Sequence, residues 1–297
     1  MSEAPQSSFR PKTVAIISKP GRPELSGILP SLHQWLSQRS YKVMMDRESA
    51  QYFSAADVVS RSELGSRSPD LALVLGGDGT LLSAARAVCR SGTLILGVNL
   101  GTLGFLTELA LADLYPALEA IEKGQYMVDS RAMLSCSLVR GGGAVATHIA
   151  LNDVVVSKSA ISRLNYFELF VDQEFVSSYK ADALIVATPT GSTAYSLAAG
   201  GAVAFPTADV MALTPICPHT LTNRSLILPM SVTLEVRVIT PKPSTILSTD
   251  GQMVCELTTG DLITIKRSRL SVRLMQLAGS SFCETLRKKL HWRGGSL

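Results

Sequence analysis

The sequence predicts two domains of different class: a parallel α/β domain, followed by a β-rich domain. Strand and helix signals alternate up to about residue 125, and period-two alternation of hydrophobic residues replaces them afterwards. The chain has 297 residues, whereas single domains usually have roughly 100–150. Hydrophobic residues make up 46% of the sequence, which is enough to build two cores. We therefore place the domains at 1–125 and 126–274.

The first domain is predicted to be a parallel sheet with helices on both faces. Strands are expected at 13–18, 41–45, 71–75 and 93–98, where short aliphatic or β-branched runs occur. Helices are expected where leucines recur at helical spacing between Leu25 and Leu36, over 81–90, and from a capping Asp113 to Gly124. Alternation of this kind is typical of parallel sheets that helices cover on both sides.

The second domain is predicted to consist mostly of antiparallel strands. Over residues 232–239, valines and a leucine alternate with residues that are mostly polar, as in a strand with one buried face. Hairpin turns are expected at Gly141–Gly143 and at Asp250-Gly251, because these residues tolerate the left-handed backbone of tight turns. Residues 281–291 are predicted to form a final helix.

Composition excludes several classes of protein. The net charge is +4, and the densest basic stretches, 266–273 and 287–293, are interleaved with apolar residues, as on a solvated face rather than a nucleic-acid patch. Five scattered cysteines without a C-x-x-C pair favour a reducing compartment. The charge-free stretch 183–208 contains proline, glycine and hydroxyl residues, unlike a membrane span. We expect a cytoplasmic protein with neither a nucleic acid nor a membrane as partner.

A glycine-rich turn, GGDGT at residues 76–80, leads from the predicted strand 71–75 into a helix. The carboxyl edge of a parallel sheet is where such folds bind ligands, and glycine amides beside a helix N-terminus suit phosphate. A carboxylate repels phosphate, so Asp78 needs another role: to accept a proton from a hydroxyl group or to hold Mg²⁺. The alternative is a plain glycine turn in which Asp78 caps the helix.

Two further stretches place polar groups beside predicted strands. The strand 183–187 ends in TPTGSTAYS, residues 188–196, whose hydroxyls and amides can bind a base, a ribose or a phosphate; a loop without function is the alternative. Lys180 and Asp182 lie two apart and would share a face of one strand. Asn152 and Asp153 interrupt an apolar strand, either as ligands of ribose hydroxyls or as a bulge that satisfies itself.

Two loops complete the candidate site. NLGTLGFLTE, residues 99–108, follows the strand 93–98 at the same sheet edge, and Phe105 is placed to stack on a flat ring. TDGQ, residues 249–252, is most simply a hairpin turn, with a ligand contact as the alternative.

These motifs, in this order and at this spacing, resemble the NAD kinase family, over nearly all of residues 13–293. GGDGT by itself also occurs in lipid kinases and, more loosely, in phosphofructokinases, whereas the ATPTGSTAYSLAAGG stretch at 187–201 is specific. The resemblance implies a Rossmann-like N-terminal domain and a β-sandwich that hold NAD between them, with residues 275–297 packing back on the first domain. It implies transfer of the γ-phosphoryl of ATP to the 2′-hydroxyl of the adenosine ribose.

The resemblance also implies site residues. Asp78 would be the proton acceptor. The residues implied to contact NAD are Asp78, Gly79, Asn152, Asp153, Arg163, Lys180, Asp182, Thr193, Ala194, Tyr195, Ser196, Leu197, Ala198 and Gln252. The phosphate loop would be Gly76, Gly77, Gly79 and Thr80, and the further pocket-lining residues are Asn99, Phe105, Thr190 and Ser192. Mg²⁺ or another divalent cation would accompany ATP, no residue is assigned as a metal ligand, and a homodimer or homotetramer is expected.

The chain departs from the family pattern at three positions. Ala183 replaces the usual glycine, Asp153 often appears as glutamate in relatives, and Lys180 varies with arginine. None of these changes removes a group that the chemistry needs. A lipid or sugar kinase and a nucleotide sensor without catalysis remain the alternatives, and assays with NAD, NADH, diacylglycerol and fructose 6-phosphate as acceptors distinguish them.

Overall fold

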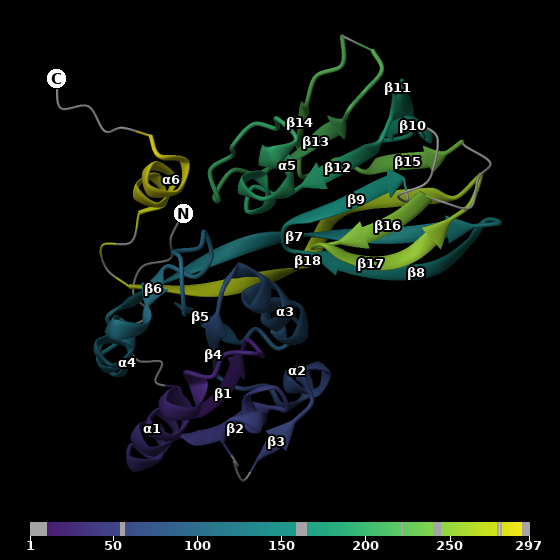
Figure 1. The fold of residues 1–297 in the computed structure, drawn as a ribbon. Coiled ribbons are helices and arrows are strands. Elements are labelled where there is room, and N and C mark those ends of the chain that lie inside the picture. Colours follow the sequence, from purple (N-terminus) through teal and green to yellow (C-terminus); the bar gives the residue numbers. More distant parts are fainter. Residues whose placement is uncertain are drawn as a thin grey trace, which may run out of the picture. The chain divides into compact units, whose positions relative to one another are not determined.

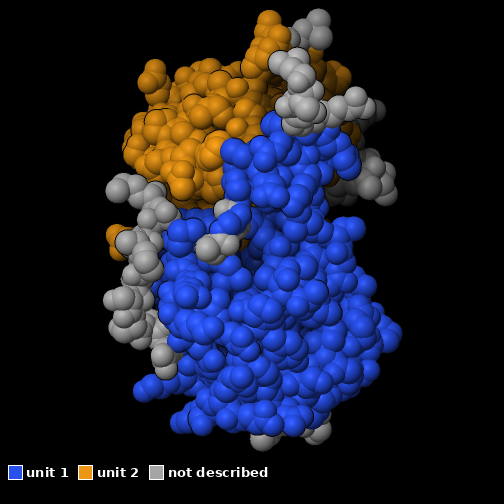
Figure 2. Space-filling model, turned by 90° about the vertical axis from the view of Figure 1, so that its left-hand side faces the viewer, with its two compact units in different colours: residues 1–130, 271–297 blue, residues 131–270 orange. Residues whose placement is uncertain are grey.

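The chain forms two compact units, shown as a ribbon in Figure 1 and as coloured surfaces in Figure 2. The computed structural model describes residues 11–53, 57–158, 165–220, 222–239, 245–277, 279 and 281–292. Unit 1 comprises residues 1–130 and 271–297, and unit 2 comprises residues 131–270. The sequence placed these boundaries at 125 and 274. The two units divide inside two long strands, β7 (Tyr126–Arg140) and β18 (Leu262–Leu277).

Unit 1 is built on a parallel sheet with the strand order β18-β5-β4-β1-β2-β3, to which β18 contributes its last residues. Its strands are β1 (Thr13–Ser18), β2 (Lys42–Asp46), β3 (Val58–Val59), β4 (Leu71–Gly76) and β5 (Leu94–Asn99), with the two-residue β6 (Leu109–Ala110) beside β5. All six residues of β4 and of β5 are buried, because helices cover both faces of a parallel sheet. The four strands predicted from the sequence are confirmed; β3 is too short to leave a hydrophobic signal.

The helices of unit 1 bury one stripe each. They are α1 (Leu25–Gln38), α2 (Leu64–Arg67), α3 (Asp78–Val88), α4 (Leu114–Glu122) and α6 (Phe282–Leu290). Leu25, Leu29, Leu32 and Leu36 of α1 are fully buried, as the helical spacing predicted. The helix α3 begins three residues earlier than predicted, directly at Asp78. Among the described residues, no helix combines the length and apolar character needed to span a bilayer.

The strand order fixes where unit 1 can bind a ligand. The chain passes from β1 to β2 on one side and from β4 to β5 on the other, so β1 and β4 flank the point where the winding reverses. Doubly wound sheets bind ligands at this point, at the carboxyl ends of the strands. The GGDGT turn directly follows β4 and therefore lies there.

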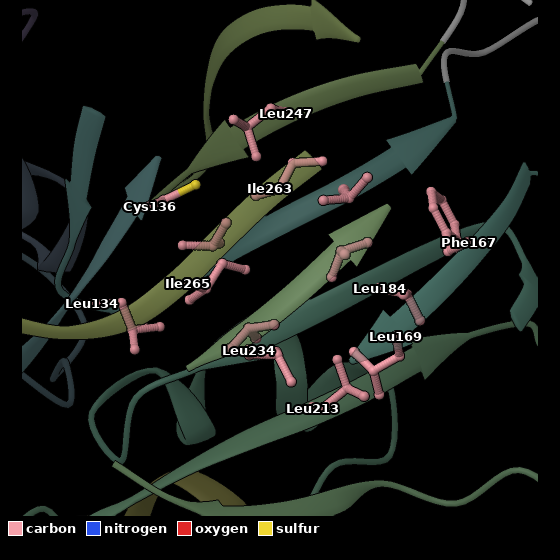
Figure 3. Packing of buried hydrophobic residues seen from close by; sticks show 14 of the residues in the cluster. Leu134, Cys136, Phe167, Leu169, Leu184, Leu213, Leu234, Leu247, Ile263 and Ile265 are labelled. Atoms are coloured by element: carbon pink, nitrogen blue, oxygen red, sulfur yellow. The ribbon is translucent and has the colours of Figure 1, made fainter. Parts of the chain in front are cut away.

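Unit 2 consists of two antiparallel sheets that share one hydrophobic core, which confirms the predicted β-rich domain (Figure 3). One sheet has the order β14-β13-β12-β9-β16-β17, and the other contains β11-β10-β15-β18, with β7 paired to β18 and to β8. The strands not yet given are β8 (Gly143–Ala150), β9 (Asp153–Lys158), β10 (Asn165–Val171), β11 (Glu174–Ala181), β12 (Ala183–Ala187), β13 (Val210–Ile216), β14 (Leu226–Pro229), β15 (Leu234–Val238), β16 (Thr245–Thr249) and β17 (Gln252–Leu257); α5 spans Tyr195–Ala198. Phe167, Leu184 and Leu213 are among the residues that fill the space between the sheets.

Both predicted hairpins of unit 2 are present. Gly141 and Gly142 have positive φ between β7 and β8, and Asp250 and Gly251 have φ of 47° and 74° between β16 and β17. A third hairpin, between β10 and β11, was missed, because its turn residues Asp172 and Gln173 are not a glycine pair although both are left-handed.

Candidate active site

The GGDGT turn changes from strand to helix within two residues. Gly77 is extended, with φ −116° and ψ −172°, and α3 starts at the next residue. A Cβ at Gly76 would lie 2.5 Å from Oγ1 of Thr80 and 3.2 Å from Cβ of Lys19, so only glycine fits the close approach of β1, β4 and α3. A Cβ at Gly77 or Gly79 would meet nothing within 4 Å. The turn is therefore packed on one side and open at Gly77 and Gly79, as a phosphate loop must be.

Asp78 does not cap its own helix, so the simple-turn interpretation is wrong in that respect. Its Oδ2 accepts the N–H of Phe105 at 2.9 Å, and its Oδ1 accepts the N–H groups of Leu106 and Thr107 and the hydroxyl of Thr107, each at 3.1 Å. A Cβ at Gly104 would collide with Oδ1 of Asp78. The 104–107 segment is thus shaped around this carboxylate and fixes its orientation.

Asn99 holds the same loop in place. Its Nδ2 donates to the carbonyl oxygen of Thr102 at 2.5 Å and to the Thr107 hydroxyl at 3.1 Å, and its Oδ1 accepts the Gly101 N–H at 2.6 Å. Asn99 is therefore a structural residue of the loop. Phe105, predicted to stack on a ligand ring, lies with its ring centroid 5.8 Å from the ammonium group of Lys289 on α6.

In unit 2, Asn152 and Asp153 do not interrupt a strand, which corrects the prediction. The strand β8 ends at Ala150 and β9 begins at Asp153, so Asn152 lies in the link between two strands. The carboxylate of Asp250 accepts the backbone N–H groups of this link: Leu151 at 3.1 Å, Asn152 at 2.7 Å and Asp153 at 3.3 Å. The DGQ hairpin therefore does more than turn the chain, because it fixes the Asn152 link.

The TPTGSTAYS stretch packs on the same link. The N–H of Thr188 donates to the carbonyl oxygen of Asn152 at 2.8 Å, and the Thr188 hydroxyl donates to that of Leu151 at 2.6 Å. A Cβ at Gly191 would collide with the Asn152 carbonyl oxygen, so glycine is required there. Three motifs that are distant in sequence, at 152–153, 188–196 and 249–252, thus meet within unit 2.

The Ser and Thr hydroxyls of that stretch form hydrogen bonds within the protein, some of them inside the turn itself. Ser192 donates to the carbonyl oxygen of Pro189 at 2.6 Å, Thr193 to that of Thr190 at 3.1 Å, and Ser196 bonds to Thr214 at 3.1 Å. Thr190, predicted to line the pocket, accepts from Arg131 at 3.3 Å. Tyr195 is 51% exposed, so its ring is the free aromatic surface of this turn. The other members proposed to bind NAD, Ala194, Leu197 and Ala198, lie in or directly before α5 and are at least partly exposed.

Burial is unfavourable for two polar groups of the Asn152 link, one on Asn152 and one on Asp153. Oδ1 of Asn152 is buried and accepts no hydrogen bond from the described residues. Burial, together with the neighbouring Asp250 carboxylate, raises the pKa of Asp153 from 3.8 to about 7. An unsatisfied buried acceptor is costly in free energy, and a donor supplied by a ligand would remove this cost.

The remaining predicted residues are placed as follows. Lys180 ends up on β11 with its ammonium group 5.4 Å from the ring centroid of Tyr166, whereas Asp182 lies between β11 and β12 and forms an ion pair of 2.7 Å with Lys158. The prediction that the two share one strand face is therefore wrong, because β11 ends at Ala181 and the chain bends at Asp182. Gln252 is exposed at the start of β17. Arg163 lies outside the described residues.

Sequence reasoning missed the roles of four residues that support the candidate site residues. Gly104, Thr107 and Asp250 act through contacts between segments far apart in sequence, and Lys158 is the partner of Asp182. The two glycines of NLGTLG and the Asp-Gly turn were the signals available. The glycines indicated only a close loop at the sheet edge, and TDGQ indicated a hairpin turn, with a ligand contact as the alternative. Among the described residues, no three His, Cys, Asp or Glu side chains gather as metal ligands.

Known proteins match this chain over both units. The profile of the ATP-NAD kinase N-terminal domain matches residues 14–126, and that of the ATP-NAD kinase C-terminal domain matches residues 151–277. An NAD kinase of Koribacter versatilis is 49% identical over 281 residues, 95% of this chain and 98% of the relative, and one of Acidobacterium capsulatum is 44% identical over 95% and 99%.

Two solved structures are similar over nearly the whole chain. The yeast NADH kinase complexed with NADH has a TM-score of 0.88 at 25% identity and covers 100% of this chain and 95% of its own. The Archaeoglobus fulgidus NAD kinase in complex with ATP has a TM-score of 0.73 at 25% identity and covers 95% and 100%.

Proposed function

This chain belongs to the NAD kinase family, and on that premise we propose that it transfers the γ-phosphoryl of ATP to the 2′-hydroxyl of the adenosine ribose of NAD, which gives NADP and ADP. The observation that carries the proposal is the fixed carboxylate of Asp78 beside an open glycine turn at the reversal point of the parallel sheet. Phosphoryl transfer depends mainly on positioning and charge stabilisation, and a rigidly held base beside a phosphate loop supplies the first of these.

We propose that Asp78 accepts the proton of the 2′-hydroxyl through Oδ2. Oδ1 already accepts three hydrogen bonds, whereas Oδ2 accepts one, from Phe105. Because each carboxylate oxygen has two lone pairs, Oδ2 has room for the substrate hydroxyl. A base positioned in this way typically contributes a factor of about 10²–10⁴ to the rate.

The triphosphate of ATP would lie over Gly76–Thr80 and the first turn of α3. The open sides of Gly77 and Gly79 leave room for phosphate oxygens, and the helix N-terminus favours negative charge. Mg²⁺ would arrive with ATP and take its ligands mainly from the phosphates and water, because the Asp78 oxygens are largely occupied within the protein.

The NAD nucleoside would be bound by unit 2. Oδ1 of Asn152 offers an acceptor for a ribose hydroxyl, Asp153 holds a carboxyl group beside it, and the exposed ring of Tyr195 offers a stacking surface. The remaining expectations, Arg163, Lys180, Asp182 and Gln252 as NAD contacts, stay part of the proposal.

We also keep a homodimer or homotetramer as part of the proposal. β11 is an edge strand of its sheet and carries Phe175 and Val176 with 54% and 42% of their surface exposed, which supports an interface there. Light scattering of the purified protein coupled to size exclusion measures the state directly, and a monomer at all concentrations would contradict it.

The decisive experiment compares Asp78→Asn with the wild type in an assay of NADP formed from NAD and Mg·ATP. We expect NAD binding to remain and kcat to fall at least 100-fold, since the amide cannot accept the proton. Asp70→Asn is the matched control, because Asp70 also accepts the N–H groups of two residues, Lys12 and Thr13, yet at the opposite, amino-terminal edge of the sheet. Full activity of Asp78→Asn, or wild-type transfer to diacylglycerol or fructose 6-phosphate but not to NAD, would refute the proposal.

A further inference from the structure

The turn between β16 and β17 carries a carboxylate whose hydrogen bonds are directed at the Asn152 link. Asp250 adopts a left-handed backbone with φ of 47°, and its side chain is nine-tenths buried. Oδ1 accepts the N–H groups of Asn152 at 2.7 Å and Asp153 at 3.3 Å, and Oδ2 accepts that of Leu151 at 3.1 Å. Three successive amides that are not paired along a strand are therefore satisfied by one side chain.

A plain hairpin does not need this arrangement. The β10–β11 hairpin has an aspartate, Asp172, at the equivalent left-handed position with φ of 48°, and its carboxylate accepts one exposed N–H, that of Thr233, at 2.8 Å. Asp250 instead is buried and lies near a second carboxyl group, that of Asp153, whose pKa is raised by burial first and by Asp250 second. The fold tolerates this repulsion at the Asn152 link, which indicates that the link must be held in one conformation.

The link that Asp250 holds presents a group without a partner. Oδ1 of Asn152 is buried and accepts no hydrogen bond within the described chain. On the other side of the link, Thr188 bonds the carbonyl oxygens of Leu151 and Asn152, so the link is fixed through its donors by Asp250 and through its acceptors by Thr188. A backbone fixed on both sides sets the direction of the Asn152 side chain.

We propose that Asp250 is a positioning residue of the dinucleotide site, which fixes the Leu151–Asp153 backbone so that Oδ1 of Asn152 is aligned to accept a hydrogen bond from a ribose hydroxyl of NAD. The proposal rests on the function proposed above. Asp250 acts through Asn152 and touches no reacting atom, so its loss weakens NAD binding and leaves the interaction with ATP intact.

The test uses the full chain and measures the Kd of NAD by calorimetry and the KM of NAD and of ATP by NADP formation. In Asp250→Asn the turn is retained, because asparagine tolerates the left-handed region, but one of the two acceptor oxygens becomes a donor. We expect the Kd and KM of NAD to rise about tenfold, as for a lost hydrogen bond to a charged group, with the KM of ATP unchanged. Asp172→Asn is the matched control and should behave as the wild type.

A double-mutant cycle separates positioning from a general loss of structure. If Asp250 acts through Asn152, the double variant Asp250→Asn/Asn152→Ala binds NAD no more weakly than Asn152→Ala. The proposal is wrong if the losses of NAD affinity of the two single variants multiply in the double variant. It is also wrong if the Kd of NAD for Asp250→Asn lies within twofold of the wild type. Asp250→Gly, which also suits the turn, replaces Asp250→Asn if the latter does not fold. A wild type that binds no NAD would refute the proposed function instead, so the two failures are distinguishable.

Discussion

Each unit uses an aspartate to gather successive backbone N–H groups of a distant loop, but the two arrangements leave different groups available. In unit 1 Asp78 is itself the group proposed to act on the substrate, and the 105–107 amides orient it. In unit 2 the Asp250 carboxylate accepts the amides of 151–153, and the group left without a partner among the described residues is Oδ1 of Asn152. The loop thus orients the acid in unit 1, whereas the acid orients the loop in unit 2.

The comparison shows that such hydrogen bonds alone do not indicate function. Asp70 also accepts the N–H groups of two successive residues, Lys12 and Thr13, and so joins the start of β1 to the residue before β4. What separates Asp78 is its place at the carboxyl edge, beside open glycines, and what separates Asp250 is the unsatisfied acceptor that it holds. The place of the aspartate in the fold and an unsatisfied acceptor beside it, rather than the hydrogen bonds themselves, therefore point to function.

The largest effect is expected from Gly104→Ala, which tests whether the loop orients Asp78. The added Cβ would collide with Oδ1 of Asp78, so either the carboxylate or the loop must move. We expect kcat for NADP formation to fall at least 100-fold, about 2.7 kcal/mol, because misplacement by about 1 Å has that cost.

Gly101→Ala is the control within the same loop. The nearest atom to a Cβ there is a guanidinium nitrogen of Arg22 at 3.6 Å, an ordinary contact, and φ is not positive at either glycine. This variant should retain most of its activity. If both variants keep the wild-type kcat, the loop does not orient Asp78 and the comparison between the units fails.

Much of the fold was predictable because it depends on local patterns. The strands at β1, β4 and β5, the buried stripe of α1 and the hairpin at Asp250-Gly251 each follow from periodicity or turn chemistry. Asp78 and the Asn152 pair were also identified as candidates, the pair from an odd placement and both by family resemblance. Local sequence and the resemblance therefore located the groups that are proposed to face the substrates.

The supporting groups were not predictable, because their partners are distant in sequence. Asp250 lies 98 residues from Asn152, and Thr107 lies 29 residues from Asp78. A hairpin aspartate and a loop threonine have common local explanations, and nothing in the sequence indicates that one side chain accepts three amides. The strand break at Asp182 was missed for the same reason, since Lys158 on another strand pairs with it.

A smaller effect, on stability, tests the carboxyl pair of unit 2. The pKa of Asp153 is raised from 3.8 to about 7, by burial first and by Asp250 second, so the folded state binds a proton more tightly than the unfolded chain. Stability therefore falls as the pH rises from about 4 to about 7 and changes no further above it. We therefore compare the free energy of unfolding of Asp153→Asn with that of the wild type. We expect this difference to change by about 1–2 kcal/mol in favour of the variant when the pH is raised from 5.5 to 8.

The measurement is urea unfolding followed by circular dichroism at both pH values. Circular dichroism is needed for unit 2, since both tryptophans, Trp35 and Trp292, belong to unit 1. Asp172→Asn, in an exposed hairpin, should keep the pH dependence of the wild type. If Asp153→Asn also keeps it, burial does not raise the pKa of Asp153 and the carboxyl pair does not lower the stability of unit 2.

The smallest effect is expected from Thr107, which sharpens the description of unit 1. The Thr107 hydroxyl donates to Oδ1 of Asp78 at 3.1 Å and accepts from Nδ2 of Asn99 at 3.1 Å, while its N–H also reaches Oδ1. Thr107→Val removes the hydroxyl and keeps the shape and all three N–H donors. We expect kcat to fall about five- to tenfold, about 1–1.4 kcal/mol, the effect of one ordinary hydrogen bond because three N–H donors remain, with the KM of NAD unchanged. Thr107→Ser keeps the hydroxyl and should restore the rate. Equal rates in Thr107→Val and the wild type would mean that the backbone amides alone orient Asp78. The hydrogen bonds that matter would then be to backbone amides for Asp78 as well as for Asp250.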